Sequence, residues 1–205
     1  MNNKGLLNIV TEGLETGESF SALLKLKNEL IENIRIESLK NSGTKASDIS
    51  VIKRITKYEK ERPIFGKAHP FSLNGTFYFG FTEGHYVVAS ENSFEYSEAT
   101  EAEKVDMEKF FIQNYNRIDE IEVDITDLKV FSSTEKRKLP NPYILVDKEG
   151  VKHAFNPFYL LDVLQFNDTN IIEVELENSY RPAFVKNESK NTLGLLLPIR
   201  IKQEV

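Results

Sequence analysis

Residues 155–164 read Phe155-Asn156-Pro157-Phe158-Tyr159-Leu160-Leu161-Asp162-Val163-Leu164. They predict a helix with a defined start. The Asn156 side chain can accept hydrogen bonds from the first turn, and Pro157 fixes φ at a position where no backbone donor is needed. The apolar residues that follow recur at three- and four-residue spacing, which is typical of a helix that packs against a core.

Strand-like segments flank this helix on both sides. Residues 151–155 alternate in polarity before it, and residues 171–177 alternate after it. Residues 181–186 and 193–201 predict two further strands, and the last of these contains Leu195-Leu196-Leu197-Pro198-Ile199-Arg200-Ile201. The predicted order is strand, helix and three strands, a βαβββ unit.

This C-terminal quarter of the chain resembles the last half-domain of bacterial DNA polymerase III sliding clamps (beta clamps). The likeness rests on the Phe-Asn-Pro-x-Tyr-Leu-Leu-Asp-x-Leu helix and on the terminal Leu-Leu-Pro-Ile-Arg-Ile strand. A weaker likeness lies upstream, in residues 62–69 and in Phe81-Thr82-Glu83-Gly84-His85, which is similar to the family's Thr-Asp-Gly-His-Arg-Leu segment. Each domain of that family has two βαβββ halves, so the resemblance implies an α+β, DNA-clamp-like domain of two such halves.

The resemblance also implies a domain organisation. We expect a helical N-terminal extension over residues 1–44 and a clamp-like domain over residues 45–205. The extension would hold a helix over residues 17–40, because apolar residues recur along one face after a capping serine at position 19. The two halves of the clamp-like domain would span about residues 45–127 and 143–201.

The first half is predicted to begin with a helix over residues 47–61, ended by Pro63. Its apolar face would hold Ile49, Ile52 and Ile55. A hairpin of residues 64–69 and 76–81 should follow, because Asn74-Gly75 suits a type I′ turn.

The segment between the halves, residues 91–127, is strongly acidic. We predict a short helix near residues 106–115, a strand over 121–125 and an exposed connection over 132–142. Alternation along that strand would place Glu120, Glu122 and Asp124 on one face, which favours an exposed acidic surface over a magnesium site. Imitation of nucleic acid is a second use for such a segment.

Composition excludes several classes of function. The 205 residues include no Cys, so a disulfide scaffold, a thiol nucleophile and thiolate-bound zinc are excluded. A net charge of -6 argues against nucleic-acid binding over the whole surface. No apolar run approaches a membrane span and no signal-type core follows Met1, so we expect no membrane partner and a cytoplasmic protein.

No residue pattern indicates catalysis. The sequence has no phosphate-binding glycine loop, no nucleophile elbow and no paired-histidine helix. His69, His85 and His153 lack metal-ligand spacing and are better explained as surface or satisfied core residues. We therefore expect a protein that is not an enzyme, with no catalytic residues, no cofactor and no metal.

The resemblance implies a peptide-binding cleft. In the clamp family, hydrophobic clefts accept short peptides of polymerases and loaders, and this chain matches their borders at Thr82, Gly84, His85, Leu196, Leu197, Pro198, Ile199 and Arg200. The family's borders come from adjacent domains, and its Arg-Leu after Gly-His is Tyr86-Val87 here. A buried strand with a neighbouring turn is the alternative explanation of the same residues.

A basic stripe on the first predicted helix is the second candidate site. Lys53, Lys57 and Lys60, with Arg54 beside them, lie where clamp helices face DNA, although a solvated helix face has the same pattern. The second helix carries Asp162 and no Lys or Arg within residues 156–166. This departs from the expectation for a ring that encircles DNA.

The best interpretation is a non-enzymatic accessory protein of DNA replication or repair that resembles a miniature sliding clamp. Its partners would be proteins with clamp-binding peptides, and double-stranded DNA and further copies of the chain remain open as partners. One alternative is a phage-type decoy that binds host replication or defence proteins through a clamp-like shape. Another is a DNA-binding regulatory protein with only a fold-level likeness. A composition rich in Asn, Lys, Ile and Glu is typical of a low-GC bacterium or its phage.

Overall fold

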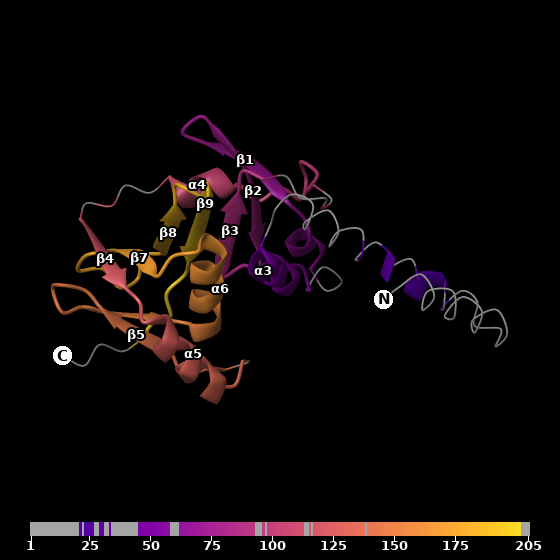
Figure 1. Ribbon diagram of the computed structural model, residues 1–205. Coiled ribbons are helices and arrows are strands. Elements are labelled where there is room, and N and C mark those ends of the chain that lie inside the picture. Colours follow the sequence, from indigo (N-terminus) through magenta and orange to yellow (C-terminus); the bar gives the residue numbers. More distant parts are fainter. Residues whose placement is uncertain are drawn as a thin grey trace. The chain divides into compact units, whose positions relative to one another are not determined.

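The computed structural model describes residues 45–57, 62–92, 96, 98–112, 115, 117–137 and 139–201, together with isolated positions between 21 and 33 (Figure 1). The chain divides into two compact units, residues 1–44 and 45–205. The positions described between 21 and 33 are helical, as the sequence predicts. Ser19 and most of the predicted helix over residues 17–40 lie outside the described residues, as does Lys60.

An antiparallel sheet forms the centre of the second unit. Within the described part of the chain it has seven strands in the order β1-β2-β3-β9-β8-β7-β4. These are β1 (His69–Leu73), β2 (Thr76–Thr82), β3 (Tyr86–Ser90), β4 (Ile118–Glu122), β7 (Ile171–Glu175), β8 (Ala183–Asn187) and β9 (Thr192–Leu196). The hairpin of β5 (Tyr143–Val146) and β6 (Lys152–Phe155) forms a separate sheet.

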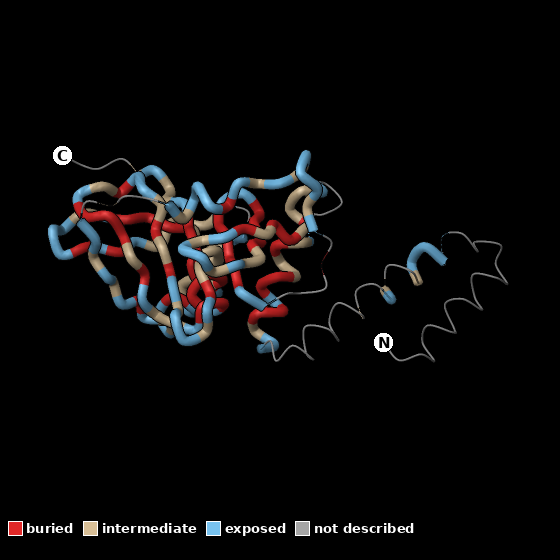
Figure 2. The backbone as a smooth tube through the Cα atoms, turned by 90° about the horizontal axis from the view of Figure 1, so that it is seen from above, coloured by how far each residue is buried: buried red, intermediate tan, exposed pale blue. Residues whose placement is uncertain are grey.

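Helices cover both faces of the large sheet. They are α3 (Ala46–Thr56), the 3₁₀ helix η1 (Pro63–Gly66), α4 (Met107–Phe111), α5 (Ile125–Thr134) and α6 (Pro157–Asn167). Helices α3 and α6 pack against each other and against the sheet, and α5 packs on α6 (Figure 1). Met107 of α4 closes an apolar cluster on the other face with Phe71 and Leu195. Most of the buried hydrophobic residues belong to the strands of the large sheet or to α3 and α6, and Figure 2 shows in red the segments of the chain that are buried. The mixed helix and sheet architecture is therefore as predicted.

Two runs of one helix and three strands meet within the sheet. Helix α3 precedes β1, β2 and β3 along the chain, and helix α6 precedes β7, β8 and β9. The last strands of these two runs, β3 and β9, are paired antiparallel (Figure 1). The strand before α6 differs from the expectation, because β6 pairs with β5 and takes no place in the large sheet.

Local sequence signals account for several elements. The Asn156 side chain accepts hydrogen bonds from the amides of Phe158 and Tyr159, at 3.0 and 3.4 Å, which fixes the start of α6. Asn74 and Gly75 have φ values of 50° and 83°, as a type I′ turn requires. The predicted apolar face of α3 is confirmed, because Ile49, Ile52 and Ile55 are buried.

Two predicted strands and a predicted loop are corrected by the structure. A strand was expected over residues 64–69, but residues 63–66 form η1 and β1 begins only at His69, since Pro63 fixes a helical φ in the first turn. The strand expected over 121–125 lies at residues 118–122. Asp124 then caps α5 by accepting hydrogen bonds from the amides of Thr126 and Asp127, at 2.8 and 3.0 Å. Asp124 therefore leaves the face of Glu120 and Glu122, and the connection predicted over 132–142 begins inside helix α5.

Candidate functional site

The turn between β2 and β3 is built by Thr82. Its hydroxyl donates to the carbonyl of Tyr86 at 2.8 Å and accepts from the amide of Gly84 at 3.0 Å. Gly84 has φ of 101°, and a Cβ there would lie 3.2 Å from the Phe65 ring, so a side chain would be both strained and crowded. Thr82 thus holds the turn from inside, while Gly84 and His85 lie at its exposed tip.

The pairing of β3 with β9 brings the second predicted border to this turn. Tyr86 pairs with Leu196, and the amide of Leu197 donates to the carbonyl of His85 at 3.0 Å. The chain then crosses to β6, where the amide of Ile199 donates to the carbonyl of Ala154 at 2.7 Å. Two motifs that lie far apart in the sequence are therefore joined by main-chain hydrogen bonds.

The predicted cleft residues divide by burial. Thr82 and Leu196 are buried, and Leu196 lies on the face covered by α6, so both contribute to the core. Leu197 is 39% exposed, and Pro198 and Ile199 are partly buried beside it. Those available to a ligand are Gly84, His85, Leu197, Pro198, Ile199 and Arg200.

An aromatic stack of His85, Tyr159 and Tyr86 supports the turn, and only His85 was among the predicted site residues. The rings of His85 and Tyr159 are stacked with centroids 5.8 Å apart, and Tyr159 stacks on Tyr86 at 5.0 Å. Tyr159 belongs to the helix motif that carried the resemblance. Its place against His85 follows from tertiary packing of α6 on β3, which helical periodicity does not reveal.

Glu83 links the stack to the turn. One carboxylate oxygen lies 3.2 Å from Nδ1 of His85, and the other accepts from the Tyr159 hydroxyl at 3.5 Å. Burial raises the pKa of Glu83, and the neighbouring His85 offsets part of that rise. The carboxyl group therefore lies beneath the exposed tip and is held by both aromatic neighbours.

A buried carboxylate, Asp162, ties the two large helices together. Oδ2 and Oδ1 accept from Nε and Nη2 of Arg54 at 3.1 and 2.5 Å, in a forked pair between α6 and α3. The hydroxyl of Tyr86 donates to Oδ2 at 3.1 Å, and Nη2 of Arg137 lies 3.7 Å from the same oxygen. Burial, followed by the charge of Asp162, raises the pKa of Tyr86 well above its usual value, so its hydroxyl stays a donor.

The basic stripe on α3 is only partly continuous. Arg54 turns toward Asp162 with its side chain 30% exposed, so this predicted DNA contact has a carboxylate partner. Lys53 is partly buried, and Lys57 is exposed just beyond the last turn of α3. Helix α6 contributes Asp162 to this face, as its sequence indicated.

Comparison with solved structures identifies the architecture. The chain is similar to DNA polymerase III subunit beta from Borrelia burgdorferi, solved in complex with a natural product, with a TM-score of 0.52, 10% identity, and 76% of this chain and 62% of that chain covered. The chain is also similar to the sliding clamp from Bartonella birtlesii, bound to griselimycin, with a TM-score of 0.50 and 12% identity. That match covers 76% of this chain and 64% of that chain. A match to a putative beta subunit from Eubacterium rectale has a TM-score of 0.39 and 16% identity, and it covers 62% of this chain and 43% of that chain.

The protein is clamp-like in fold. The matches span less than two thirds of the length of these clamps. At such identities the Borrelia and Bartonella matches establish architecture alone. No protein-family model matches the chain, and no curated protein matches its sequence.

Two of the three histidines of this clamp-like protein are buried structural residues. His69 Nε2 donates to the carbonyl of Ile64 at 2.9 Å, and its Nδ1 accepts from the amide of Val105 at 3.2 Å. Burial lowers the pKa of His69, which favours this neutral form. His153 lies 3.1 Å from Asp147 beneath the β5–β6 turn. The described residues contain no group of three His, Asp or Glu side chains that could hold a metal ion.

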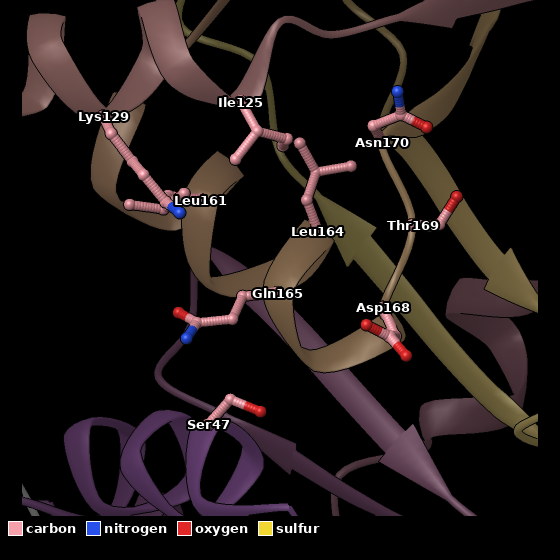
Figure 3. A pocket seen from close by; sticks show the side chains of 9 residues that line it. All are labelled: Ser47, Ile125, Lys129, Leu161, Leu164, Gln165, Asp168, Thr169 and Asn170. Carbon is pink, nitrogen blue, oxygen red and sulfur yellow. The ribbon is translucent and has the colours of Figure 1, made fainter.

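A separate groove lies among the helices of the clamp-like domain. It has a volume of about 410 Å³ and is lined by Ser47 of α3, by Ile125 and Lys129 of α5, by three residues of α6 and by the turn that follows (Figure 3). None of the predicted cleft or DNA-contact residues lines it. Among the described helices, none is both long and apolar enough to cross a membrane.

Proposed function

We propose that this clamp-like protein is a non-enzymatic accessory factor of DNA replication or repair that binds short linear peptides of polymerases or clamp loaders. The observation that carries the proposal is the pairing of β3 with β9, which joins the Gly84–His85 tip to Leu197. Such a surface would bind a peptide by desolvating apolar anchors against partly buried side chains. Leu197, Pro198 and Ile199 would form its floor.

We further infer that residues 45–205 comprise two halves related by a local twofold axis between β3 and β9. The support is the repeated order of one helix and three strands, with the third strands paired at the centre. Under this arrangement one chain would carry both borders of the cleft. The clamp family takes those borders from adjacent domains, so this chain would need no second domain to complete its site.

Replacement of Pro198 and Ile199 by serine tests the cleft. Binding of a short peptide from the clamp-binding segment of a replicative polymerase should be abolished, measured by fluorescence anisotropy. Ile171→Ser is a matched control, because Ile171 is 41% exposed on β7, away from the turn. Unchanged affinity in the Pro198 and Ile199 variant, with circular dichroism also unchanged, would remove the cleft from the proposal.

The decoy is the second candidate. Engagement of Arg54 by Asp162 and the net charge of -6 favour a protein partner over DNA. If the protein is a decoy, the same cleft binds host replication or defence proteins, and the protein does not bind duplex DNA. Lys53→Glu combined with Lys57→Glu should then leave a duplex-binding assay unchanged at every salt concentration. A loss of binding with a shallower salt dependence would instead identify the stripe as a phosphate contact.

Assembly state separates the candidates further. A ring around DNA requires more than one copy of a chain this short, since a closed ring is built from repeated subunits. Mass measurement in solution, with and without duplex DNA, should show an assembly only if encirclement is retained. A monomer under both conditions would exclude a ring around DNA and favour a function through the peptide cleft.

A further inference from the structure

Three arginines near the proposed cleft share an arrangement that the proposed function does not explain. Each places its guanidinium over an aromatic ring, with the carbon to ring-centroid distances being 5.6 Å for Arg62 over Phe65, 5.4 Å for Arg137 over Phe158 and 5.9 Å for Arg200 over Tyr180. All three arginines are exposed. In a chain with an excess of acidic residues, such a concentration of guanidinium groups calls for a specific role.

Each arginine–aromatic pair is connected to a residue of the proposed cleft or of the aromatic stack beside it. The Phe65 ring lies against Gly84 at the tip of the turn, so Arg62 borders one side. Phe158 precedes Tyr159 of the aromatic stack, and Arg137 reaches Asp162 beneath it. Arg200 directly follows Ile199, whose amide anchors the cleft segment to β6. Each guanidinium group is therefore linked, through its ring or a neighbouring residue, to one segment of the proposed cleft.

A position over a ring leaves the guanidinium groups of Arg62 and Arg200 able to bind an anion. A guanidinium that lies over a ring uses its flat face, and its N–H donors stay at the edge, where they match a carboxylate bidentately. Among the described residues, Arg62 and Arg200 have no carboxylate partner. The acids nearest the stack, Glu83 and Asp162, are only 9% and 4% exposed, and both are already engaged.

We infer that the cleft selects an acidic linear peptide, in which Asp or Glu residues flank the apolar anchors. This inference rests on the proposed peptide-binding function. The aromatic partners hold Arg62, Arg137 and Arg200 in place before binding, which reduces the side-chain entropy lost when the carboxylates arrive. The apolar floor supplies affinity, and the arginines decide which sequences are accepted.

The test uses the full chain and three synthetic peptides with the same Leu and Phe anchors, flanked by Asp, Asn or Lys. The Asp peptide should bind about tenfold more tightly than the Asn peptide, from two or three partly exposed ion pairs, and the advantage should shrink at high salt. The Lys peptide should bind more weakly than both. Equal affinity of the Asp and Asn peptides would overturn the inference and leave the cleft intact. Binding of none of the three would overturn the proposed function as well.

Variants assign the effect to the arginines. In Arg62→Gln combined with Arg200→Gln, the preference for Asp over Asn should fall to about twofold or less, because only Arg137 remains. Arg62→Lys combined with Arg200→Lys keeps the charge without the planar fork and should retain only part of the preference. Lys109→Gln removes one exposed charge on α4 and should change nothing. If the glutamine variant kept its peptide preference but lost binding to a short DNA duplex, the arginines would serve phosphate contacts and the inference would be wrong.

Discussion

The two predicted sites differ in what holds them together. At the cleft, the turn before β3 and the segment after β9 are joined by strand pairing and by the bond from the Leu197 amide to the His85 carbonyl. At the stripe, Lys53, Arg54 and Lys57 share only a helix and its end. One of the three, Arg54, turns to Asp162 of the neighbouring helix. Main-chain pairing therefore brings the residues of one predicted site together, while side-chain pairing interrupts the other predicted site.

The difference follows from how each kind of contact is satisfied. Backbone amides and carbonyls in a sheet must be paired, so two strands that adjoin carry their flanking residues into fixed proximity. A cation on a helix has no such obligation, and it takes whatever partner the opposite surface offers. Arg54 finds a carboxylate that is 4% exposed, which it neutralises within the packed interior.

The largest expected effect comes from removing that carboxylate. Asp162→Ala should destabilise the protein by about 3 kcal/mol, because Arg54 loses its forked partner and the buried Tyr86 hydroxyl loses its acceptor. The partial exposure of Arg54 keeps the cost at the low end of the range for broken buried pairs. Urea unfolding, followed by far-ultraviolet circular dichroism, measures the change.

Glu101→Gln is the matched control for this measurement. It also removes one carboxylate charge, but the Glu101 side chain is 91% exposed and its partner, Lys104, lies on the surface. The control should unfold at an unchanged urea concentration. If Asp162→Ala also unfolded at an unchanged urea concentration, the ion pair of Arg54 with Asp162 would not stabilise the fold. Arg54 would then count again, with Lys53 and Lys57, as a predicted DNA contact.

The second prediction concerns the packing of α6 on β9, the strand that leads into the predicted cleft segment. A Cβ at Gly194 would lie 2.4 Å from Val163 Cγ1 and 2.7 Å from Asn167 Nδ2, so Gly194→Ala should cost about 2 kcal/mol through overpacking. Gly75→Ala provides the comparison. Nothing lies within 4 Å there, and only the positive φ is strained, at about 1 kcal/mol. An equal or smaller cost at Gly194, again in urea, would mean that α6 can move away from β9 without penalty.

The sequence predicted the elements of the fold better than their partners. Asn156 and Pro157 marked the start of α6, and Asn74-Gly75 marked the hairpin, because caps and tight turns depend on a few adjacent residues. Helix α5 was missed because its first turn follows an acidic stretch and Asp124 was assigned to a strand. The pairing of β6 with β5 also went unforeseen, since strand partners are chosen by tertiary packing.

Prediction of the candidate site had the same limit. The residues of the turn and of the terminal segment were recognised by their likeness to a family, yet their division into buried and exposed members depends on which face α6 covers. Leu196 and Leu197 are adjacent and chemically identical, but Leu196 is the last residue of β9 and is buried, whereas Leu197 lies beyond the strand and is 39% exposed. Tyr159 and the three arginines over aromatic rings needed tertiary structure, because each contact joins separate elements.

The smallest expected effect is a change in how the stability of the folded protein depends on pH. It arises from Glu83, which lies on the side of the predicted cleft and not on the stripe. Burial raises the pKa of Glu83 above its unfolded value, so the folded protein binds more protons than the unfolded chain between those two pKa values. Stability from this group is fully present below about pH 4.3, the usual pKa of Glu, and is lost as pH rises through the folded pKa. Glu83→Gln, which stays neutral, should remove this part of the pH dependence.

The difference in stability between the parent protein and the Glu83→Gln variant at each pH reports on Glu83 alone, because the other acidic residues contribute equally to both. Urea midpoints measured from pH 4 to pH 7 should show the Gln variant gaining stability relative to the parent as pH rises. The glutamine oxygen can accept from His85 Nδ1, and the glutamine NH2 group can donate to the Tyr159 hydroxyl oxygen, so both neighbours of residue 83 keep a partner. Parallel curves would mean that the Glu83 carboxyl is as well solvated in the folded protein as in the unfolded chain. The predicted cleft would then lack the buried acid beside His85.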